Sequence, residues 1–170
     1  MRVFPDSEEL AEEIARSWCE QVKMAVNNCG TFSVVLSGGS QDPALYGRLT
    51  EHKWRGRIPW ESVHIFFADE RCVPPDDNES NYKTICGHLL NHVPIPEKNI
   101  HRMRGEGDPV EESFRYAEEV QNHLVLRKEK TCFFDWVRAL LCAVGSGVAN
   151  ERRRGPIIGT RYGLVSESRW

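Results

Sequence analysis

The chain has 170 residues, of which 40% are hydrophobic and 28% are charged, and its formal net charge is -3. These values are typical of a soluble globular domain with a buried core. The slight negative charge argues against nucleic acid or an anionic membrane as a partner, and no apolar segment is long enough to span a bilayer. Because the first residues also lack the apolar core of a signal peptide, we expect a cytoplasmic protein.

Metal binding is not indicated by the sequence. Six cysteines are scattered without a Cys-x-x-Cys pair, which argues against a zinc ribbon or a disulfide scaffold and favours reduced thiols. His88 and His92 lie four residues apart, as zinc ligands on one helix do, but no third ligand accompanies them. We therefore expect no metal, and we assign both histidines to a polar helix surface.

The first expected element is a helix that begins near Ser7, a candidate N-cap, and ends before Gly30. Glutamates in its first turn complement the helix dipole. Its apolar residues recur at helical spacing and predict one buried face: Leu10, Ala11, Ile14, Ala15, Trp18 and Val22.

A strand is expected next, over residues 32–36, because this short run is apolar and rich in β-branched and aromatic side chains. It leads into Ser37, Gly38, Gly39 and Ser40, and a helical pattern follows over residues 43–50. Glycine lets backbone N–H groups approach a phosphate, and the positive end of a helix dipole favours negative charge. The segment therefore predicts an anion site, although a plain tight turn would use the same residues.

A second apolar strand, over residues 63–68, delivers Asp69, Glu70 and Arg71 to its carboxyl end, where a proline-rich stretch predicts a long loop. In an open parallel sheet, ligands bind outside the carboxyl ends of the strands. We therefore expect Asp69 and Arg71 to lie beside the glycine-serine turn and a small phosphorylated molecule. A structural ion pair is the alternative interpretation of these two residues.

The following pattern alternates helices with extended segments. Helices are expected from Ser80 and from Asp108, and extended segments over residues 100–103 and 133–137. The helix after Asp108 has an apolar side: Val110, Phe114, Ala117, Val120 and Leu124. This alternation predicts an α/β, Rossmann-like three-layer fold with a mostly parallel sheet.

The composition changes after Val137. Residues 138–170 are rich in glycine, serine and arginine and do not complete another strand-helix-strand unit. We therefore expect one α/β domain over residues 1–137, with a sheet that is incomplete at its C-terminal end, and a divergent tail over residues 138–170. In this tail, Gly145-Ser146-Gly147 lacks the third glycine of a dinucleotide site, and Arg152-Arg153-Arg154 is typical of a solvated charge run.

Several motifs occur in order before residue 137. They are Ser-Gly-Gly-Ser at 37–40, Ile-Pro-Trp at 58–60, Asp-Glu-Arg-Cys-Val at 69–73, Ser-Asn-Tyr at 80–82 and Val-Pro-Ile-Pro at 93–96. Together they resemble the 6-phosphogluconolactonases of the pentose phosphate pathway. The resemblance covers residues 1–137, which would then be a sugar-phosphate lactonase-like α/β domain.

This resemblance implies hydrolysis of 6-phosphoglucono-δ-lactone to 6-phosphogluconate without a metal or an organic cofactor. The substrate that the resemblance implies is a small sugar phosphate, and its pocket would be lined by Ser37, Gly38, Gly39 and Ser40. Asp69 and Arg71 would lie at the reacting end. An arginine can bind an oxyanion or a phosphate through two parallel hydrogen bonds, and an aspartate can orient a base or sugar hydroxyls.

The sequence departs from the family pattern in two places. Gln41-Asp42 stands where Thr-Pro is usual, so Asp42 adds a negative charge at the mouth of the anion site. The family's Asp-Gly-His-Thr-Ala-Ser, whose histidine the resemblance implies as general base, is absent from this sequence. We interpret the divergent ending as a truncation through a frameshift, alternative splicing or a gene-model error, which predicts impaired or lost activity. His101 is the best remaining basic candidate for the pocket rim, although a structural role is favoured for it and for His64.

Two other functions stay open. The Ser-Gly-Gly-Ser turn also resembles that of the glucosamine-6-phosphate deaminases, so an aminosugar-phosphate isomerase or deaminase is an alternative. The chain could also be a truncated remnant that binds sugar phosphate without catalysis. In that case the sheet edge over residues 133–137, left without its next strand, would favour association.

Overall fold

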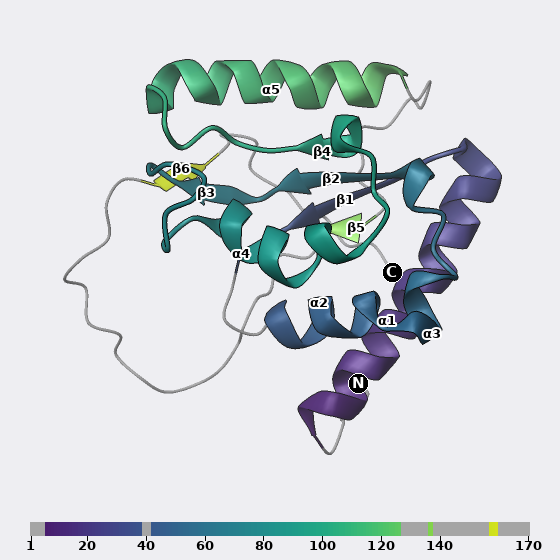
Figure 1. Ribbon diagram of the computed structural model, residues 1–170. Coiled ribbons are helices and arrows are strands. Elements are labelled where there is room, and N and C mark those ends of the chain that lie inside the picture. The colour runs from purple at the N-terminus through teal and green to yellow at the C-terminus, as the bar shows by residue number, and fades with distance from the viewer. Residues whose placement is uncertain (1–5, 39–41, 127–135, 138–156, 160–170) are drawn as a thin grey trace.

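The computed structural model describes residues 6–38, 42–126, 136–137 and 157–159 (Figure 1). The helices are α1 (Ser7–Cys29), α2 (Asp42–Thr50), α3 (His52–Arg55), α4 (Asn81–His88) and α5 (Pro109–Leu126). The strands are β1 (Phe32–Leu36), β2 (Val63–Phe67), β3 (Asp69–Arg71), β4 (Ile100–His101), β5 (Trp136–Val137) and β6 (Ile157–Gly159). Short 3-10 turns lie over Trp60–Ser62, Leu90–His92 and Glu97–Asn99.

The centre of the fold is a four-stranded parallel sheet in the order β4-β2-β1-β5. Helix α5 covers one face of this sheet, and α1 and α2 lie on the other side (Figure 1). The described residues thus form the three-layer α/β arrangement that the alternating pattern predicts, and the predicted fold class is confirmed. Among the described helices, none is long and apolar enough to cross a membrane.

The two faces of the sheet differ in chemistry. On one face, Phe32 lies beside Val63 and packs against the fully buried Trp18 of α1. On the other face, Ser33 lies beside His64 and Val35 lies beside Phe66, under α5. The first face carries most of the apolar core, whereas the second mixes apolar and polar side chains.

The N-cap of helix α1 is Asp6, one residue before the predicted Ser7. The Asp6 carboxylate, and not Ser7, accepts hydrogen bonds from the N–H groups of Glu8 and Glu9 at 2.9 and 2.8 Å. Gly30 ends the helix with a φ of 81°, a left-handed conformation that favours glycine. The predicted buried face of α1 is confirmed except at Leu10, a residue that is 41% exposed.

Helix α5 begins as predicted, because the Asp108 carboxylate accepts hydrogen bonds from the N–H groups of Val110 and Glu111. Its predicted apolar face is confirmed at Val120, which packs against the core, and is wrong at the start of the helix. Val110 and Phe114 are 63% and 73% exposed, whereas Tyr116 and Glu112 are buried against the sheet and its loops. Polar contacts explain this rotation.

The Tyr116 hydroxyl accepts a hydrogen bond from the Phe67 N–H at 2.7 Å and lies 3.2 Å from the carbonyl oxygens of Phe67 and His101. The Glu112 carboxylate accepts a hydrogen bond from the Arg104 N–H at 2.8 Å and pairs with Arg115. Leaving these strand and loop groups unpaired would cost more than exposing two apolar side chains. The Leu124 side chain of the predicted face lies outside the described residues.

Residues 69–71 form a strand and do not begin a loop, which corrects the expectation for this segment. Strand β3 pairs antiparallel with β6, and Glu70 lies opposite Ile158. The irregular stretch starts only after Arg71. Strand β6 belongs to the predicted tail, of which the structure describes residues 157–159 alone, so the division of the chain at Val137 stays a prediction. The expected strand at 133–137 is described only at Trp136–Val137.

Candidate functional site

The carboxyl ends of β1 and β2 lie side by side, as the parallel register requires. Leu36 lies opposite Phe67, and the Ala68 N–H donates to the Leu36 carbonyl at 2.8 Å. Ser37 and Gly38 continue from the first strand, and Asp69 continues from the second. Gly39 and Ser40 lie outside the described residues, so their part in the site stays a prediction.

A hydrogen bond from α2 fixes the chain where it leaves β1. Tyr46, which is fully buried on this helix, donates a hydrogen bond from its hydroxyl to the Ser37 carbonyl at 2.7 Å. This contact fixes the direction in which the chain leaves the strand. It also orients the start of α2 relative to the turn, as an anion site at a helix N-terminus needs.

Asn81, at the start of α4, joins the two predicted halves of the site. Its side-chain amide donates to the Asp69 carbonyl at 3.0 Å. A Cβ atom on Gly38 would lie only 2.2 Å from the Asn81 Oδ1 atom, so Asn81 presses directly on the Gly38 backbone. Glycine is therefore required at position 38 because of close approach, and one side chain connects the Ser37-Gly38 turn to the strand that carries Asp69 and Arg71.

Asp69 and Arg71 form an ion pair, with 3.1 Å between the Arg71 Nη1 and Asp69 Oδ2 atoms. Their side chains are 33% and 35% exposed, so a small molecule can reach both. The Arg71 backbone is held separately. A Cβ atom on Gly105 would lie 2.0 Å from the Arg71 carbonyl oxygen, which shows how tightly the segment after β4 packs there.

Glu70 positions this segment from inside the protein. Its carboxylate is buried and accepts four hydrogen bonds, from the N–H groups of Arg71, Asn81 and Tyr82 at 2.8, 2.7 and 2.8 Å and from the Ser80 hydroxyl at 3.1 Å. Ser80 is also the N-cap of α4. A carboxylate is stabilised at a helix N-terminus, where unpaired N–H groups point outward. Glu70 thus fixes α4, and with it Asn81, against β3.

Glu70 and Asn81 are positioning residues that the sequence patterns do not identify as such. The sequence contains both the Asp-Glu-Arg and the Ser-Asn-Tyr motif. Nothing in their spacing shows that Glu70 of the first motif accepts hydrogen bonds from all three residues of the second. The close approach of Asn81 to Gly38 is likewise a property of the fold alone.

Nucleophilic chemistry is not favoured among the titratable groups near α4. Burial raises the pKa of the Cys86 thiol, and burial together with the Cys86 contact raises the pKa of Tyr82 to about 12. Both groups are therefore protonated at neutral pH and poor nucleophiles. The charged and hydrogen-bonding groups at the strand ends are better suited to bind an anion than to attack a substrate.

The two histidines considered in the sequence lie elsewhere. His101 stacks on Phe66, with ring centroids 4.2 Å apart, and its side chain is 13% exposed. It is hydrogen-bonded to His64 and Glu119 in the layer between the sheet and α5. Neither residue is among the contacts of Asp69 or Arg71 that the structure describes, so His101 is not placed at the rim of the candidate site.

An open groove of about 590 Å³ lies between β4 and α5, and it contains none of the described residues of the predicted site. Its lining includes Arg102 and Arg115, but Arg102 pairs with Glu106, and Arg115 pairs with Glu112 and Glu119. We place the candidate site at the strand ends and not in this groove, because the Ser37-Gly38 turn, Asp69 and Arg71 lie at the strand ends.

Comparison with known proteins places these motifs in one family. A family model described as glucosamine-6-phosphate isomerases/6-phosphogluconolactonase matches residues 5–141. The chain belongs to this family. The match includes all of the candidate site residues, from Ser37 to Arg71, and ends shortly after β5.

Individual proteins of this family are similar to a large part of the chain. A 6-phosphogluconolactonase of Haemophilus influenzae is 33% identical over 136 residues, which are 79% of this chain and 54% of that protein. The human GDH/6PGL endoplasmic bifunctional protein is 42% identical over 97 residues, 57% of this chain and 12% of its own length. The crystal structure of the devB protein superposes with a TM-score of 0.71 at 29% identity, covering 80% of this chain and 55% of that one.

The chain spans about half the length of the Haemophilus relative and of the devB structure. The part that the family model matches, residues 5–141, holds β1, β2, β3 and α4, and therefore the whole candidate site as the structure describes it. The family membership is thus established for the N-terminal region, where the isomerase/lactonase pattern and the three-layer fold agree.

Proposed function

We propose that this chain holds the sugar-phosphate-binding part of a 6-phosphogluconolactonase, and that its reaction is the hydrolysis of 6-phosphoglucono-δ-lactone to 6-phosphogluconate. The names of its relatives support the reaction. The observation that carries the proposal is the Asn81 bridge, because it assembles the Ser37-Gly38 turn and the Asp69–Arg71 pair at one edge of a parallel sheet. Such edges are where open α/β sheets bind ligands.

In this proposal the two halves of the site bind opposite ends of the substrate. The turn over residues 37–40 and the start of α2 supply N–H groups and a helix dipole for the phosphate. Arg71, held by Asp69, lies at the lactone end, where its guanidinium donates hydrogen bonds to the carbonyl oxygen. Ser37 and Ser40 add hydroxyl donors beside the phosphate.

The chemical step adds water to the lactone carbonyl carbon; the water gives up one proton to solvent, and a tetrahedral oxyanion forms. The bond from this carbon to the ring oxygen then breaks, and the ring oxygen takes one proton from solvent and leaves as a hydroxyl, so one water is consumed and no net proton is lost from the two groups. Arg71 stabilises the oxyanion, which is the contribution that a preorganised donor makes to acyl transfer. Because the sequence has no Asp-Gly-His, no histidine of that motif is available to deprotonate the water, and we expect binding to be better retained than hydrolysis.

The test is calorimetric titration of the purified chain with 6-phosphogluconate, paired with a lactonase assay. We expect saturable binding that Arg71→Ala weakens at least about tenfold, since hydrogen bonds to charged groups are worth roughly 1.5–3 kcal/mol. Arg55→Ala is the matched control, because Arg55 is an exposed arginine at the end of α3. Equal affinity in the Arg71 and Arg55 variants would contradict the proposed site.

The aminosugar-phosphate reaction is the second candidate, because the family model covers isomerases as well as lactonases. It is distinguished by its product. Release of ammonia from glucosamine 6-phosphate, without hydrolysis of the lactone, would favour the deaminase. Binding of 6-phosphogluconate without either reaction would identify a sugar-phosphate-binding remnant.

A further inference from the structure

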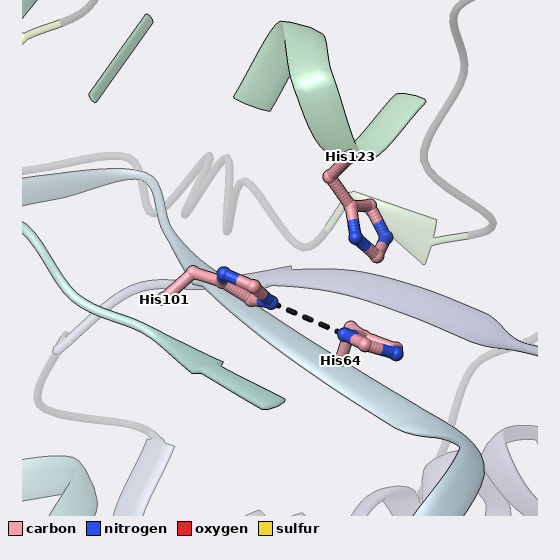
Figure 2. Close-up of side chains that lie close together, drawn as sticks. All are labelled: His64, His101 and His123. Carbon is pink, nitrogen blue, oxygen red and sulfur yellow. Dashed lines mark hydrogen bonds between the residues drawn. The ribbon is translucent and has the colours of Figure 1, made fainter. Parts of the chain in front are cut away.

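Three histidines from three separate elements meet between the sheet and α5. His64 comes from β2, His101 from β4 and His123 from α5, and Figure 2 shows their rings gathered in the space between these elements. One ring nitrogen from each lies within 4.8 Å of the others. All three side chains are partly buried, and the cluster lies under α5, away from the turn after β1 that carries Ser37 and Gly38.

We propose that His64, His101 and His123 form a binding site for one zinc ion. Three neutral imidazoles are a ligand set that suits zinc and related divalent transition metals. Two nitrogens at zinc-ligand distance in a tetrahedral site lie about 3.3 Å apart. The Nδ1 atom of His64 and the Nε2 atom of His101 are 3.1 Å apart, close to this value. The site is independent of the proposed lactonase function.

The hydrogen bonds of His101 fix its tautomer in the form that a metal requires. Its Nδ1 atom lies 2.8 Å from a Glu119 carboxylate oxygen, which only accepts, so Nδ1 carries the proton. The lone pair of the neutral ring is then on Nε2, which accepts the hydrogen bond from His64 Nδ1 (Figure 2). A zinc ion between the two nitrogens replaces this hydrogen bond, and the His64 proton then resides on Nε2 of that ring. A carboxylate behind a histidine in this way raises its basicity and orients its ring, as in many zinc sites. Stacking on Phe66 holds the same ring in plane.

His123 has a comparable support. Its Nε2 atom lies 2.8 Å from the hydroxyl oxygen of Ser33, which is fully buried on β1 beside His64. In the tautomer in which Nε2 donates to this hydroxyl, the lone pair of His123 is on Nδ1 and available to the ion. The ring centroids of His64 and His123 are 4.5 Å apart, so a rotation of one side chain brings a third nitrogen to the ion. Water would complete the coordination, as at zinc sites with three protein ligands.

The charge beside the cluster also fits a cation. Glu119 contributes a carboxylate beside the cluster, and the Arg115 that pairs with it points to its other oxygen, Oε2. Glu119 also lines the open groove between β4 and α5, so this carboxylate lies between the histidine cluster and the surface. A bound ion would connect β2, β4 and α5 and so stabilise the packing of α5 on the sheet.

The proposal is tested on the full chain, stripped of metal with a chelator and titrated with Zn²⁺ in competition with a chromophoric chelator. We expect one tight site per chain that Glu119→Gln weakens about 10–100-fold and that His123→Gln weakens by more than that. His88→Ala is the matched control, because His88 is exposed on α4 and should leave the affinity unchanged.

Co²⁺ provides a second readout that does not depend on variants. Tetrahedral nitrogen ligation of Co²⁺ gives intense visible absorption without the near-ultraviolet charge-transfer band that thiolate ligands produce, which separates this site from the six cysteines. Absence of stoichiometric binding, a thiolate band, or equal Zn²⁺ affinity in His123→Gln and the unmodified chain would each overturn the proposal. Loss of binding only in His88→Ala would do the same.

Discussion

Replacing Gly38 by alanine tests the contact that assembles the candidate site. The added Cβ would lie 2.2, 2.6 and 2.8 Å from the Oδ1, Cγ and Cβ atoms of Asn81, so the Asn81 side chain has to move. Overpacking of this kind costs about 1–3 kcal/mol. Displacing Asn81 also removes its hydrogen bond to the Asp69 carbonyl, which adds about 1 kcal/mol. We therefore expect Gly38→Ala to lower the free energy of unfolding by about 2–4 kcal/mol.

The assay is urea denaturation of the variant beside a matched control. Gly47→Ala serves this purpose, because Gly47 lies within α2 and a Cβ there would meet nothing within 4 Å. We expect this control to be stabilised by about 0.5–1 kcal/mol, since alanine loses less backbone entropy in a helix.

A second substitution at Asn81 isolates the clash. In an Asn81→Gly background no side chain remains to collide with position 38, so the cost of Gly38→Ala should fall below about 1 kcal/mol, as expected for two contacting residues. The same cost in both backgrounds, or a Gly38→Ala variant as stable as the unmodified chain, would refute the reasoning.

Three further predictions concern the framework around the site. Glu70→Gln should cost about 2–4 kcal/mol in urea denaturation, because the amide places a donor against N–H groups that the carboxylate now satisfies; a loss below 1 kcal/mol would argue against this role. Tyr116→Phe should cost about 1–3 kcal/mol by leaving the Phe67 N–H unpaired, and an unchanged urea midpoint would show that water replaces the hydroxyl. The hydrogen bond from Arg102 lowers the pKa of Glu106 to about 2 from an ordinary 4.5, so its stabilisation is complete above pH 4.5 and is lost as the pH falls through 2. Because Glu106 is 37% exposed, Glu106→Gln should lower the free energy of unfolding by less than about 1 kcal/mol at pH 6, and by still less at pH 2, where the unmodified chain has itself lost most of this stabilisation. An equal effect at both pH values would contradict the lowered pKa.

The sheet and the position of the candidate site follow from local sequence. Short apolar strands with polar residues directly behind them predict both the parallel sheet and the edge at which Ser37 and Asp69 follow their strands. These features depend on contacts between near neighbours and on the rule that parallel strands share a carboxyl edge. The structure confirms the strands at 32–36 and 63–67 and the helix starts at Asp108 and Ser80.

The rotation of α5 could not be read from its hydrophobic pattern. Its apolar residues predict a face containing Val110 and Phe114, but the helix turns to satisfy backbone groups of Phe67 and Arg104 through Tyr116 and Glu112. Those partners lie far away in the sequence, so a single-helix pattern has no information about them. Side-chain hydrogen bonds to a neighbouring strand end therefore override a weak amphipathic signal.

The same limit applies to β3 and to the histidine cluster. Residues 69–71 are predicted as a loop because their pairing partner, β6, lies in a segment with no strand pattern of its own. His64, His101 and His123 have no metal-ligand spacing in the sequence, since each comes from a different element. Only the three-layer packing brings them together.

The most direct test of the sugar-phosphate site is thermal unfolding of the purified chain with and without millimolar 6-phosphogluconate. A ligand that binds only the folded state raises the unfolding midpoint by mass action. We predict a cooperative transition whose midpoint rises with the ligand in the unmodified chain and in Arg55→Ala, and stays fixed in Arg71→Ala. A midpoint that does not respond to 6-phosphogluconate, or that rises equally in Arg71→Ala, would contradict the assignment of the site to the ends of β1 and β2.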